Sequence, residues 1–386
     1  MVPMAFECAP LMRSLVAWAA AHLAARQTSF QQIALRHRGS ALNAIKTSLD
    51  EGDLSSEMCL AVAMVLCSME SISNKEGLWY QHLIGGAAAL GLPAQVDSNE
   101  TTIDSRELPL ASETIVRLTA VEGGWLLRNF AYHDVLMSIT LDRAPLLSGN
   151  YWEELHTGES RKADPYFGLA SDIIYLTSRV SELNADLAAY SNGNPPPLRT
   201  VAFINSSGHE ILFHRCLQAT STSNILPDAW NIESELLAWS CKPDQGQKSL
   251  QLLAESYRSA ALLHLYRTLR RYDKIPADEV ATKISHQVST ICDLVTEMPE
   301  GCLAECTLLF PLFMAGGEAE KPQHVQTIRE KLVVINQWRH FRNVDHALET
   351  LDELWRLRAT DTFGPEGEKL DWLDITKANG TLLSIS

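Results

Sequence analysis

The chain contains no Cys-x-x-Cys pair and carries little positive charge. Its 32 lysines and arginines face 47 acidic residues, which gives a formal net charge of −15. Affinity for nucleic acid comes largely from lysines and arginines that neutralise phosphates. We therefore expect no sequence-specific DNA binding by this chain alone. The eight cysteines are scattered, and some, such as Cys59 and Cys67, lie in apolar runs. This pattern predicts reduced, buried thiols rather than disulfides.

Signals of membrane insertion and phosphate binding are also absent from the sequence. No uninterrupted apolar run reaches roughly 18 residues, so we predict no membrane span. Glu7 and Arg13 interrupt the apolar N-terminus, which argues against a signal peptide. The Gly-Gly pairs at 85–86 and 316–317 lack the spacing of a GxGxxG or P-loop motif, and no GxSxG elbow occurs. We predict no cofactor.

The residues that are present fit a large helical protein. Apolar residues make up 46% of the 386 positions, enough for a sizeable core. They recur at steps of three and four, which places them on one helix face. We predict an all-α, multi-helix domain of about a dozen packed antiparallel helices, with 200–205 as the one weak strand candidate. The clearest stripes are Ile173, Leu176, Val180, Leu183 and Leu187; Leu253, Tyr257, Ala261, Leu265 and Leu269; Val325, Ile328, Leu332 and Ile335; and Val344, Leu348, Leu351 and Trp355.

Turn-forming residues gather at 93–105, 191–197, 242–247 and 360–368. The second of these places three prolines after Ser-Asn-Gly-Asn, which cannot continue a helix. We predict either a single domain over residues 1–386 or two helical subdomains, 1–192 and 198–386.

Two patterns of histidines or cysteines resemble metal sites only weakly. His209 and His214 are five apart, so on a helix they point about 140° away from each other rather than to one side. We expect an ordinary helix with two partly exposed histidines there. Cys302 and Cys306 lack a second ligand pair nearby, which favours structural thiols. We predict no metal site in these patterns.

Two charged stretches are predicted to be solvated. Asp371 and Asp374 place two carboxylates three residues apart. No further carboxylates occur at matching spacing, so we interpret this stretch as a solvated terminal helix rather than a metal site. The other stretch is the longest basic cluster, Arg267, Arg270, Arg271 and Lys274. We interpret it as a solvated helix face rather than a phosphate site.

The densest polar and aromatic stretch runs from 130 to 145 and contains His133, Asp134, Asp142 and Arg143. His133 and Asp134 are adjacent, so on a helix they point about 100° apart and cannot form a dyad with each other. We expect a hydrogen-bonding cluster that pins two helices together. The alternative is catalysis with a distant partner, which requires a deep pocket where the four side chains converge. We assign no catalytic residue.

Several stretches, in order along the chain, resemble one known family. They are 10–24, Trp79-Tyr80-Gln81-His82-Leu83-Ile84-Gly85-Gly86-Ala87, 130–145, 166–170, 255–266 and 309–319, with 354–355 and 371–372 at the end. Together they resemble the fungal-specific transcription factor domain, the helical region that follows a binuclear zinc cluster. Within it, the branch similar to acriflavine-sensitivity control proteins matches best.

The motif residues of this resemblance are expected to have structural roles. Glu255 and Arg258 are three apart and can pair on one helix face. Pro311 can start or kink a helix. The Gly-Gly pairs at 85–86 and 316–317 permit close helix approach. Large buried area is expected from Trp18, Trp79 and Trp355.

The resemblance implies a transcription regulator in the nucleus that controls metabolic, secondary-metabolite or drug-response genes. It implies contact with a small-molecule effector, with the transcription machinery or with a related regulator, and it is compatible with a homodimer. The six-cysteine finger of the family is not in this sequence. A shortened gene prediction, a natural relative without a finger and a deliberately trimmed chain would each account for this.

Two alternatives remain open from the sequence. One is an enzyme, a cyclase or hydrolase recruited into a biosynthetic pathway, because a fold does not determine a function. The other is an interaction protein that associates with a full-length regulator.

The charge balance makes one testable prediction. At physiological salt, the purified chain should give no sequence-selective mobility shift with duplex DNA, because its net charge is repelled by phosphates. Binding at nanomolar concentration that discriminates between sequences would contradict this prediction.

Overall fold

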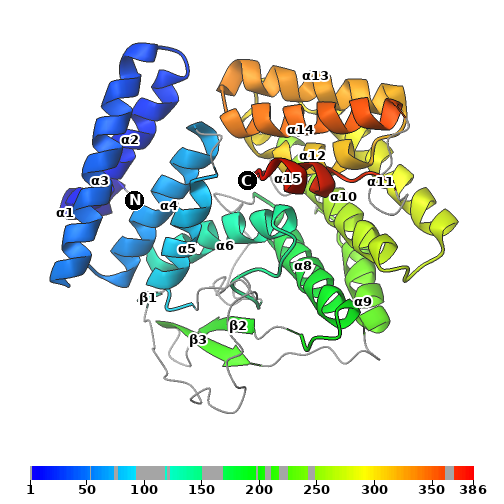
Figure 1. Ribbon diagram of the computed structural model, residues 1–386, viewed down its shortest axis with the longest axis horizontal. Helices are drawn as coiled ribbons and strands as arrows, with labels where there is room; N and C mark the ends of the chain where they lie inside the picture. The colour runs from blue at the N-terminus through cyan, green and yellow to red at the C-terminus, as the bar shows by residue number, and fades with distance from the viewer. Residues whose placement is uncertain are drawn as a thin grey trace.

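The computed structural model describes residues 2–52, 54–73, 77–92, 118–119, 122–149, 168–196, 199–204, 210–216, 225–241, 248–360 and 369–386. These residues form fourteen α-helices, two 3-10 helices and three strands (Figure 1). The predicted all-α class is therefore confirmed.

The elements follow one another in three groups along the chain. The N-terminal group consists of α1 (Val2–Glu7), α2 (Ala9–Ala24), η1 (Thr28–Phe30), α3 (Gln31–Glu51), α4 (Ser56–Ser73) and α5 (Trp79–Ala89). The middle group is β1 (Leu118–Thr119), α6 (Glu122–Thr140), α8 (Ser171–Ser191), β2 (Arg199–Ile204), β3 (Glu210–Cys216), α9 (Ile225–Ala238) and α10 (Lys248–Arg271). The C-terminal group is α11 (Ala277–Glu297), η2 (Leu303–Thr307), α12 (Leu309–Glu318), α13 (Pro322–Arg339), α14 (Arg342–Ala359) and α15 (Trp372–Asn379).

Four helices form the centre of the core. All ten residues of α12 and 16 of the 19 residues of α6 are buried, and α4 and α10 are also largely buried. A single cluster of buried hydrophobic residues includes side chains from both halves of the chain. The helix α4 is long and apolar enough to cross a membrane by length and composition alone, but 67% of it is buried by other parts of the protein. That burial is typical of a core helix.

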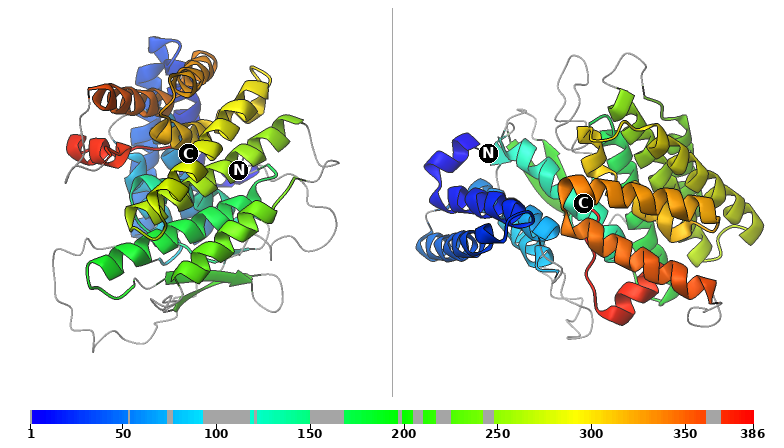
Figure 2. Two further views of the ribbon diagram at one scale, coloured as in Figure 1. Left: turned by 90° about the vertical axis from the view of Figure 1, so that its right-hand side faces the viewer. Right: turned by 90° about the horizontal axis from the view of Figure 1, so that it is seen from above.

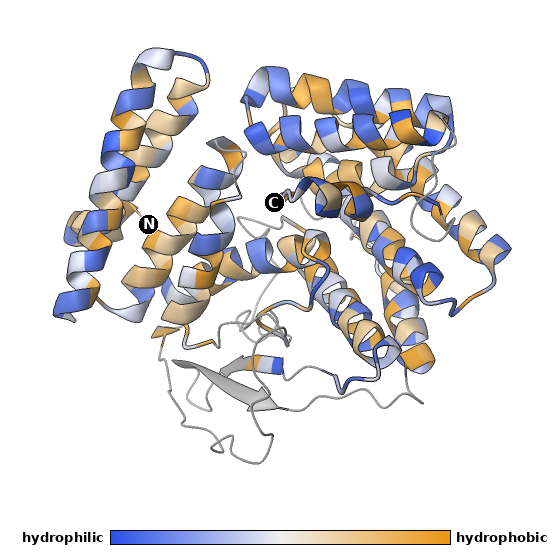
Figure 3. Ribbon diagram, in the orientation of Figure 1, coloured by the Kyte–Doolittle hydropathy of each residue, from blue (hydrophilic) through white to orange (hydrophobic). Residues whose placement is uncertain are grey.

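The predicted apolar stripes lie on the buried faces of α8, α10, α13 and α14. Every stripe residue of α8 and α10 is buried. Val325 in α13 and Leu348 in α14 are only partly buried, because these two helices lie at the surface. Figure 3 shows the many hydrophilic residues along both helices.

The helix pair α2–α3, named here the N-terminal hairpin, lies at one edge of the molecule in Figure 1 and in the right-hand view of Figure 2. The two helices pack mainly on each other, and α2 packs on α4. Only Ala34 and Ala41 of the 21 residues of α3 are buried. Apolar burial supplies most of the stability of a packed helix, so α3 is held more weakly than the central helices.

A small antiparallel sheet with strand order β1-β3-β2 lies below the helices in Figure 1. The strand β2 confirms the weak strand candidate at 200–205 over residues 200–204, and Asn205 lies outside the described residues. The expected helix over 209–214 is wrong, since residues 210–216 form β3. Thr200 to Ile204 pair with Arg215 to Ile211 in register, and this pairing with another segment, together with Ile211 and Phe213, favours a strand. His209 lies outside the described residues.

Turn residues end helices where the sequence predicts it. The helix α8 ends at Ser191, directly before the proline-rich turn. The predicted turns at 93–105 and 242–247, most of the one at 360–368, and Tyr166 and Phe167 lie outside the described residues.

The basic stretch at the end of α10 packs against acidic side chains, so its prediction as a solvated face is wrong for Arg267 and Arg270, whereas Arg271 is exposed as expected and pairs with Asp142. Arg267 is 5% exposed, and its Nε donates to Glu318 at 2.9 Å while its Nη2 donates to Asp371 at 2.6 Å. Arg270 donates to both oxygens of Glu318 at 2.8 Å. The prediction failed because the neutralising carboxylates come from α12 and α15, far away in the sequence. Lys274 is exposed, as expected.

The terminal helix α15 is packed rather than solvated, which corrects the prediction for Asp371 and Asp374. The Asp371 side chain accepts from the Leu373 amide at 3.1 Å, and Asp374 accepts from the Asp371 amide at 2.8 Å. This is a capping box. Trp372 is fully buried, with the Arg267 guanidinium 4.8 Å from its ring centre. The two carboxylates therefore cap the start of a helix.

Gly316 and Gly317 let two helices approach α12 closely, as predicted. A Cβ at Gly317 would lie 2.6 Å from Cδ1 of Trp372. A Cβ at Gly316 would lie 2.6 Å from Cδ1 of Leu351. Trp355 of α14 donates its ring N–H to the Gly316 carbonyl at 2.9 Å. The pair therefore sets the distance of α14 and α15 from α12.

For the remaining motif residues, the predicted pairing, burial and close packing are found at some positions and not at others. Glu255 and Arg258 pair at 2.8 Å. Trp79 is buried, but Trp18 is only partly buried. Gly86 packs closely, whereas nothing lies within 4 Å of a Cβ at Gly85, so the prediction of close approach at Gly85 is wrong. Pro311 lies in the first turn of α12.

The two glycine environments predict opposite effects of the same substitution. Gly317→Ala should lower the free energy of unfolding by roughly 1–3 kcal/mol, because the added methyl group overlaps the buried Trp372 ring. Gly85→Ala should be neutral or slightly stabilising, because the site is open and alanine favours helix. Urea unfolding of both variants measures this, and equal effects would contradict the packing described.

Candidate functional site

The central helix α6 carries His133 and Asp134 into the middle of the protein. Nearly every side chain of this helix is buried, so its polar groups must be satisfied internally. The four candidate residues His133, Asp134, Asp142 and Arg143 therefore depend on hydrogen bonds to neighbouring elements.

Asp134 is fully buried and organises the turn that follows α6. Its carboxylate accepts from the Arg143 guanidinium at 3.0 Å and from the Leu146 and Leu147 amides at 2.6 and 3.1 Å. Burial raises the pKa of the Asp134 carboxyl, and the guanidinium and the two amides oppose that rise. The chain after α6 is thereby held against the helix, and the charges of Asp134 and Arg143 neutralise each other.

Asp142 joins this turn to α8, α10 and α15. It has a left-handed backbone, with φ of 53°. Its carboxylate accepts from Asn184 at 3.1 Å, from Arg271 at 2.6 Å and from Lys377 at 3.3 Å. Burial disfavours its charge, but Arg271 and Lys377 together lower the pKa of Asp142 below its ordinary value. The residue is a structural connector.

His133 connects α6 to α4 and to the C-terminal tail, residues 381–386. Its Nε2 lies 3.1 Å from the Ser68 hydroxyl, and its Nδ1 lies 2.8 Å from the Ser386 hydroxyl. Thr140 donates to the Leu383 carbonyl at 2.8 Å, and Asn343 donates to the Ser386 carbonyl at 3.0 Å. Burial lowers the pKa of His133 to about 4, so the ring is neutral near pH 7.

These contacts confirm the expected hydrogen-bonding cluster and extend it. The sequence predicts that it pins two helices, whereas the structure connects α6 to α4, α8, α10, α15 and the tail. The four side chains do not converge on one another. Asp134 and Arg143 form a pair, and His133 and Asp142 bind different elements. This is the arrangement that argues against the enzyme alternative.

The described part of the chain holds no group of three or more histidine, cysteine or acidic side chains placed to bind a metal ion. Cys302 and Cys306 are partly buried free thiols on and beside η2. Cys8, Cys59, Cys67 and Cys292 are buried and free, as expected, and Cys241 is partly buried.

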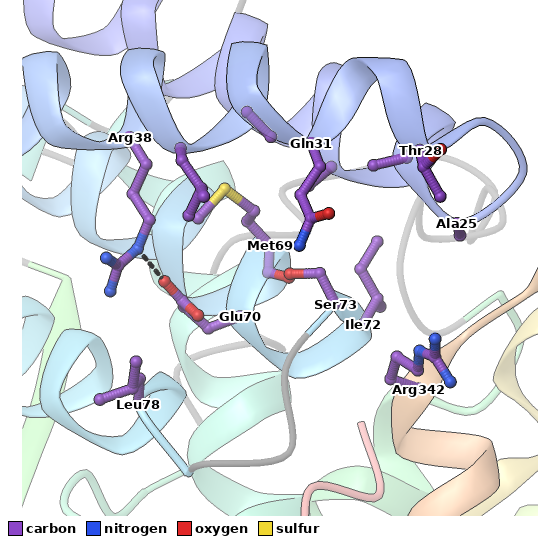
Figure 4. Close-up of a pocket in the computed structure, with 14 residues that line it drawn as sticks. Ala25, Thr28, Gln31, Arg38, Met69, Glu70, Ile72, Ser73, Leu78 and Arg342 are labelled. Carbon is purple, nitrogen blue, oxygen red and sulfur yellow. Dashed lines mark hydrogen bonds and ion pairs between the residues drawn. The ribbon is translucent and has the colours of Figure 1, made fainter.

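A cavity of about 510 Å³ lies between the N-terminal hairpin, α4 and the start of α14 (Figure 4). It is named here the hairpin cavity. Its volume lies in the range of small-molecule sites. The apolar lining residues are Ala21, Ala24, Ala25, Ala34, Leu35, Met69, Ile72 and Leu78, and the polar ones are Thr28, Gln31, Arg38, Glu70, Ser73 and Arg342.

Arg38 and Glu70 form one end of the hairpin cavity. The Arg38 Nε donates to Glu70, whose side chain is almost completely buried (Figure 4). His82 lies nearby, and its pKa is lowered by burial, with opposing effects of Glu70 and Arg38. This end therefore already contains a paired charge.

Arg342 is drawn at the other end of the cavity, apart from Arg38 (Figure 4). The last turn of α2 contacts the α13–α14 corner here. Arg26 donates to the Trp338 carbonyl at 2.9 Å, and the His22 ring meets Phe341 edge-on, with 5.8 Å between ring centres. The hairpin is thus connected to the C-terminal helices beside the cavity.

Sequence reasoning missed the hairpin cavity. Its lining comes from three distant stretches, 21–38, 69–78 and Arg342. The local signal is the run of small residues at the end of α2 and directly after it, where Ala21, Ala24 and Ala25 leave space that larger side chains would fill. None of His133, Asp134, Asp142 and Arg143 lines it.

Comparison with known proteins identifies the type of domain. The profile described as fungal specific transcription factor domain matches residues 1–385. The chain is also 22% identical over 343 residues to the transcriptional activator protein UGA3 of Saccharomyces cerevisiae. That match covers 82% of this chain but only 60% of the relative. No solved structure matches the chain.

The buried histidines predict acid sensitivity. His133 and His264 have pKa values of about 4 and about 3 when folded and an ordinary value of 6.5. Between these values the unfolded chain binds more protons, so stability falls as the pH drops from about 6.5 toward 4. His133→Gln should reduce the stability lost between pH 7.5 and 5 by about 2 kcal/mol.

Urea unfolding at several pH values measures this effect. The exposed His286 of α11 supplies a matched control, and His286→Gln should reproduce the wild-type curve. An unchanged pH dependence in His133→Gln would show that the His133 ring is not buried in its neutral form.

Proposed function

This chain belongs to the fungal specific transcription factor domain family, and from that premise we propose that it is the regulatory body of a nuclear transcription regulator. In this proposal its targets are fungal metabolic, secondary-metabolite or drug-response genes. The observation that carries the proposal is the family match over residues 1–385, supported by the similarity to a transcriptional activator. Because the chain has a net charge of −15, DNA contact is assigned to a basic module outside these residues, on the same polypeptide or on a partner.

We further propose that the hairpin cavity is the effector site of this regulator. Its walls combine the weakly buried α3 with the core helix α4 and with the first residue of α14. A ligand that contacts both sides would favour one position of the N-terminal hairpin over others, and differential affinity is what shifts such an equilibrium. The hairpin and its neighbours then present a changed surface to the transcription machinery or to a related regulator.

A tethering experiment tests the proposed function. The chain is fused to an unrelated DNA-binding domain in yeast, and a reporter gene downstream of that domain's sites is measured across carbon and nitrogen sources and xenobiotics. We expect the fusion to change reporter expression by roughly fivefold or more under at least one condition, the size of a typical allosteric coupling. A fluorescent version should accumulate in the nucleus.

The DNA-binding domain alone and the fusion carrying Gly317→Ala serve as controls for tethering and for packing. A stable nuclear fusion that leaves the reporter unchanged under every condition would contradict a regulatory role.

A further inference from the structure

We propose that the hairpin cavity binds a small amphipathic organic anion, with its acidic group at Arg342 and its apolar body on the alanine-rich wall of α2 and α3. This inference rests on the proposed effector site and specifies the class of ligand.

Among the described residues around the cavity, arginines outnumber the acidic side chains, Glu70 in the lining and Asp345 beside Arg342. Arg38 and Arg342 line it, and Arg26 and Arg339 lie at the adjoining corner. The charged neighbours that lower the pKa of His22, after its burial, are all cationic: Arg26, His340 and Arg339. In a chain with 15 excess negative charges, such a local positive region selects anions.

Arg342 is the better anchor of the two lining arginines. Arg38 is already paired with Glu70 inside the cavity wall. Among the described residues, the charged partner of Arg342 is Asp345, one turn away on the same helix at a long 3.3 Å, and the Arg342 side chain is 55% exposed. A guanidinium in this state keeps donors for a carboxylate, sulfonate or phosphate group.

The lining between the two arginines suits an apolar body. Ala21, Ala24, Ala34, Met69 and Ile72 all line the cavity. Figure 4 shows the polar side chains of Gln31 and Ser73 between Arg38 and Arg342. Methionine adapts its shape to different ligands. A molecule with one acidic end and a flat or branched apolar part would bury that part here.

Binding at Arg342 explains how a ligand could act on the regulator. Arg342 is the first residue of α14, whereas the apolar wall belongs to the N-terminal hairpin. A ligand that contacts both would add to the Arg26–Trp338 and His22–Phe341 contacts that already join the hairpin to this corner. The occupied cavity would therefore hold the hairpin against α14.

Two fluorescent probes test the proposal on the full purified chain. Anilinonaphthalene sulfonate has an acidic group on an aromatic body, and phenylnaphthylamine has nearly the same body without the charge. Arg342→Gln should weaken binding of the sulfonate roughly tenfold, the effect of one charge-assisted contact, and change binding of phenylnaphthylamine less than twofold. Arg342→Lys should restore most of the affinity for the sulfonate.

Arg356 supplies a matched control, because it lies on the same helix, is exposed and pairs with Glu353 three residues away. Arg356→Gln should leave both probes unaffected. Ala24→Phe, which fills the cavity, should abolish binding of both. Thermal melts confirm that each variant is folded.

Sulfonate affinity that is unchanged in Arg342→Gln, or that survives Ala24→Phe, would overturn the site. Equal loss of both probes in Arg342→Gln would overturn the choice of an anion. These results are independent of the tethered reporter. A responsive reporter without anion selectivity refutes only the ligand class, and selective binding with a silent reporter refutes only the regulatory role.

Discussion

Glu318 lies at the end of α12 with 3% of its surface exposed. A buried carboxylate costs several kcal/mol unless it is paired and hydrogen bonded. Arg267 and Arg270 supply that pairing from α10, and Arg267 also binds Asp371, which caps α15. The arginines hold the pKa of Glu318 below its ordinary value despite its burial, and Arg267 helps to lower that of Asp371 to about 2. Three helices must therefore keep one mutual position, because moving any of them would leave a charge buried alone.

The rest of the structure is arranged around this fixed group. The Gly316–Gly317 pair allows α14 and α15 to pack on α12, and Asp142 connects the turn after α6 to α10 and α15. The C-terminal tail then binds His133 and Thr140 of α6. Polar contacts of this kind specify one arrangement among many that apolar packing alone would tolerate.

The N-terminal hairpin lies outside this network. It is joined to the core by the packing of α2 on α4, by the Arg38–Glu70 pair and by contacts at the α13–α14 corner. Regions with little burial open at low free-energy cost. The hairpin cavity thus lies where a rigid core meets a weakly held element, and this is where a small ligand has the greatest effect on conformation.

The amino-acid sequence by itself determined the helical class, the buried stripes of α8 and α10, the end of α8 before its prolines and the family. These follow from local spacing and from residues that cannot continue a helix. Only the tertiary structure decided the roles of charged and polar groups. Arg267 and Arg270 of α10 became part of an ion cluster around the buried Glu318, Asp371 became a helix cap and residues 210–216 became a strand. Their partners are dozens or hundreds of positions away, and neither burial nor strand pairing can be read from neighbours in sequence. The cavity beside Arg342 depends on the same long-range contacts.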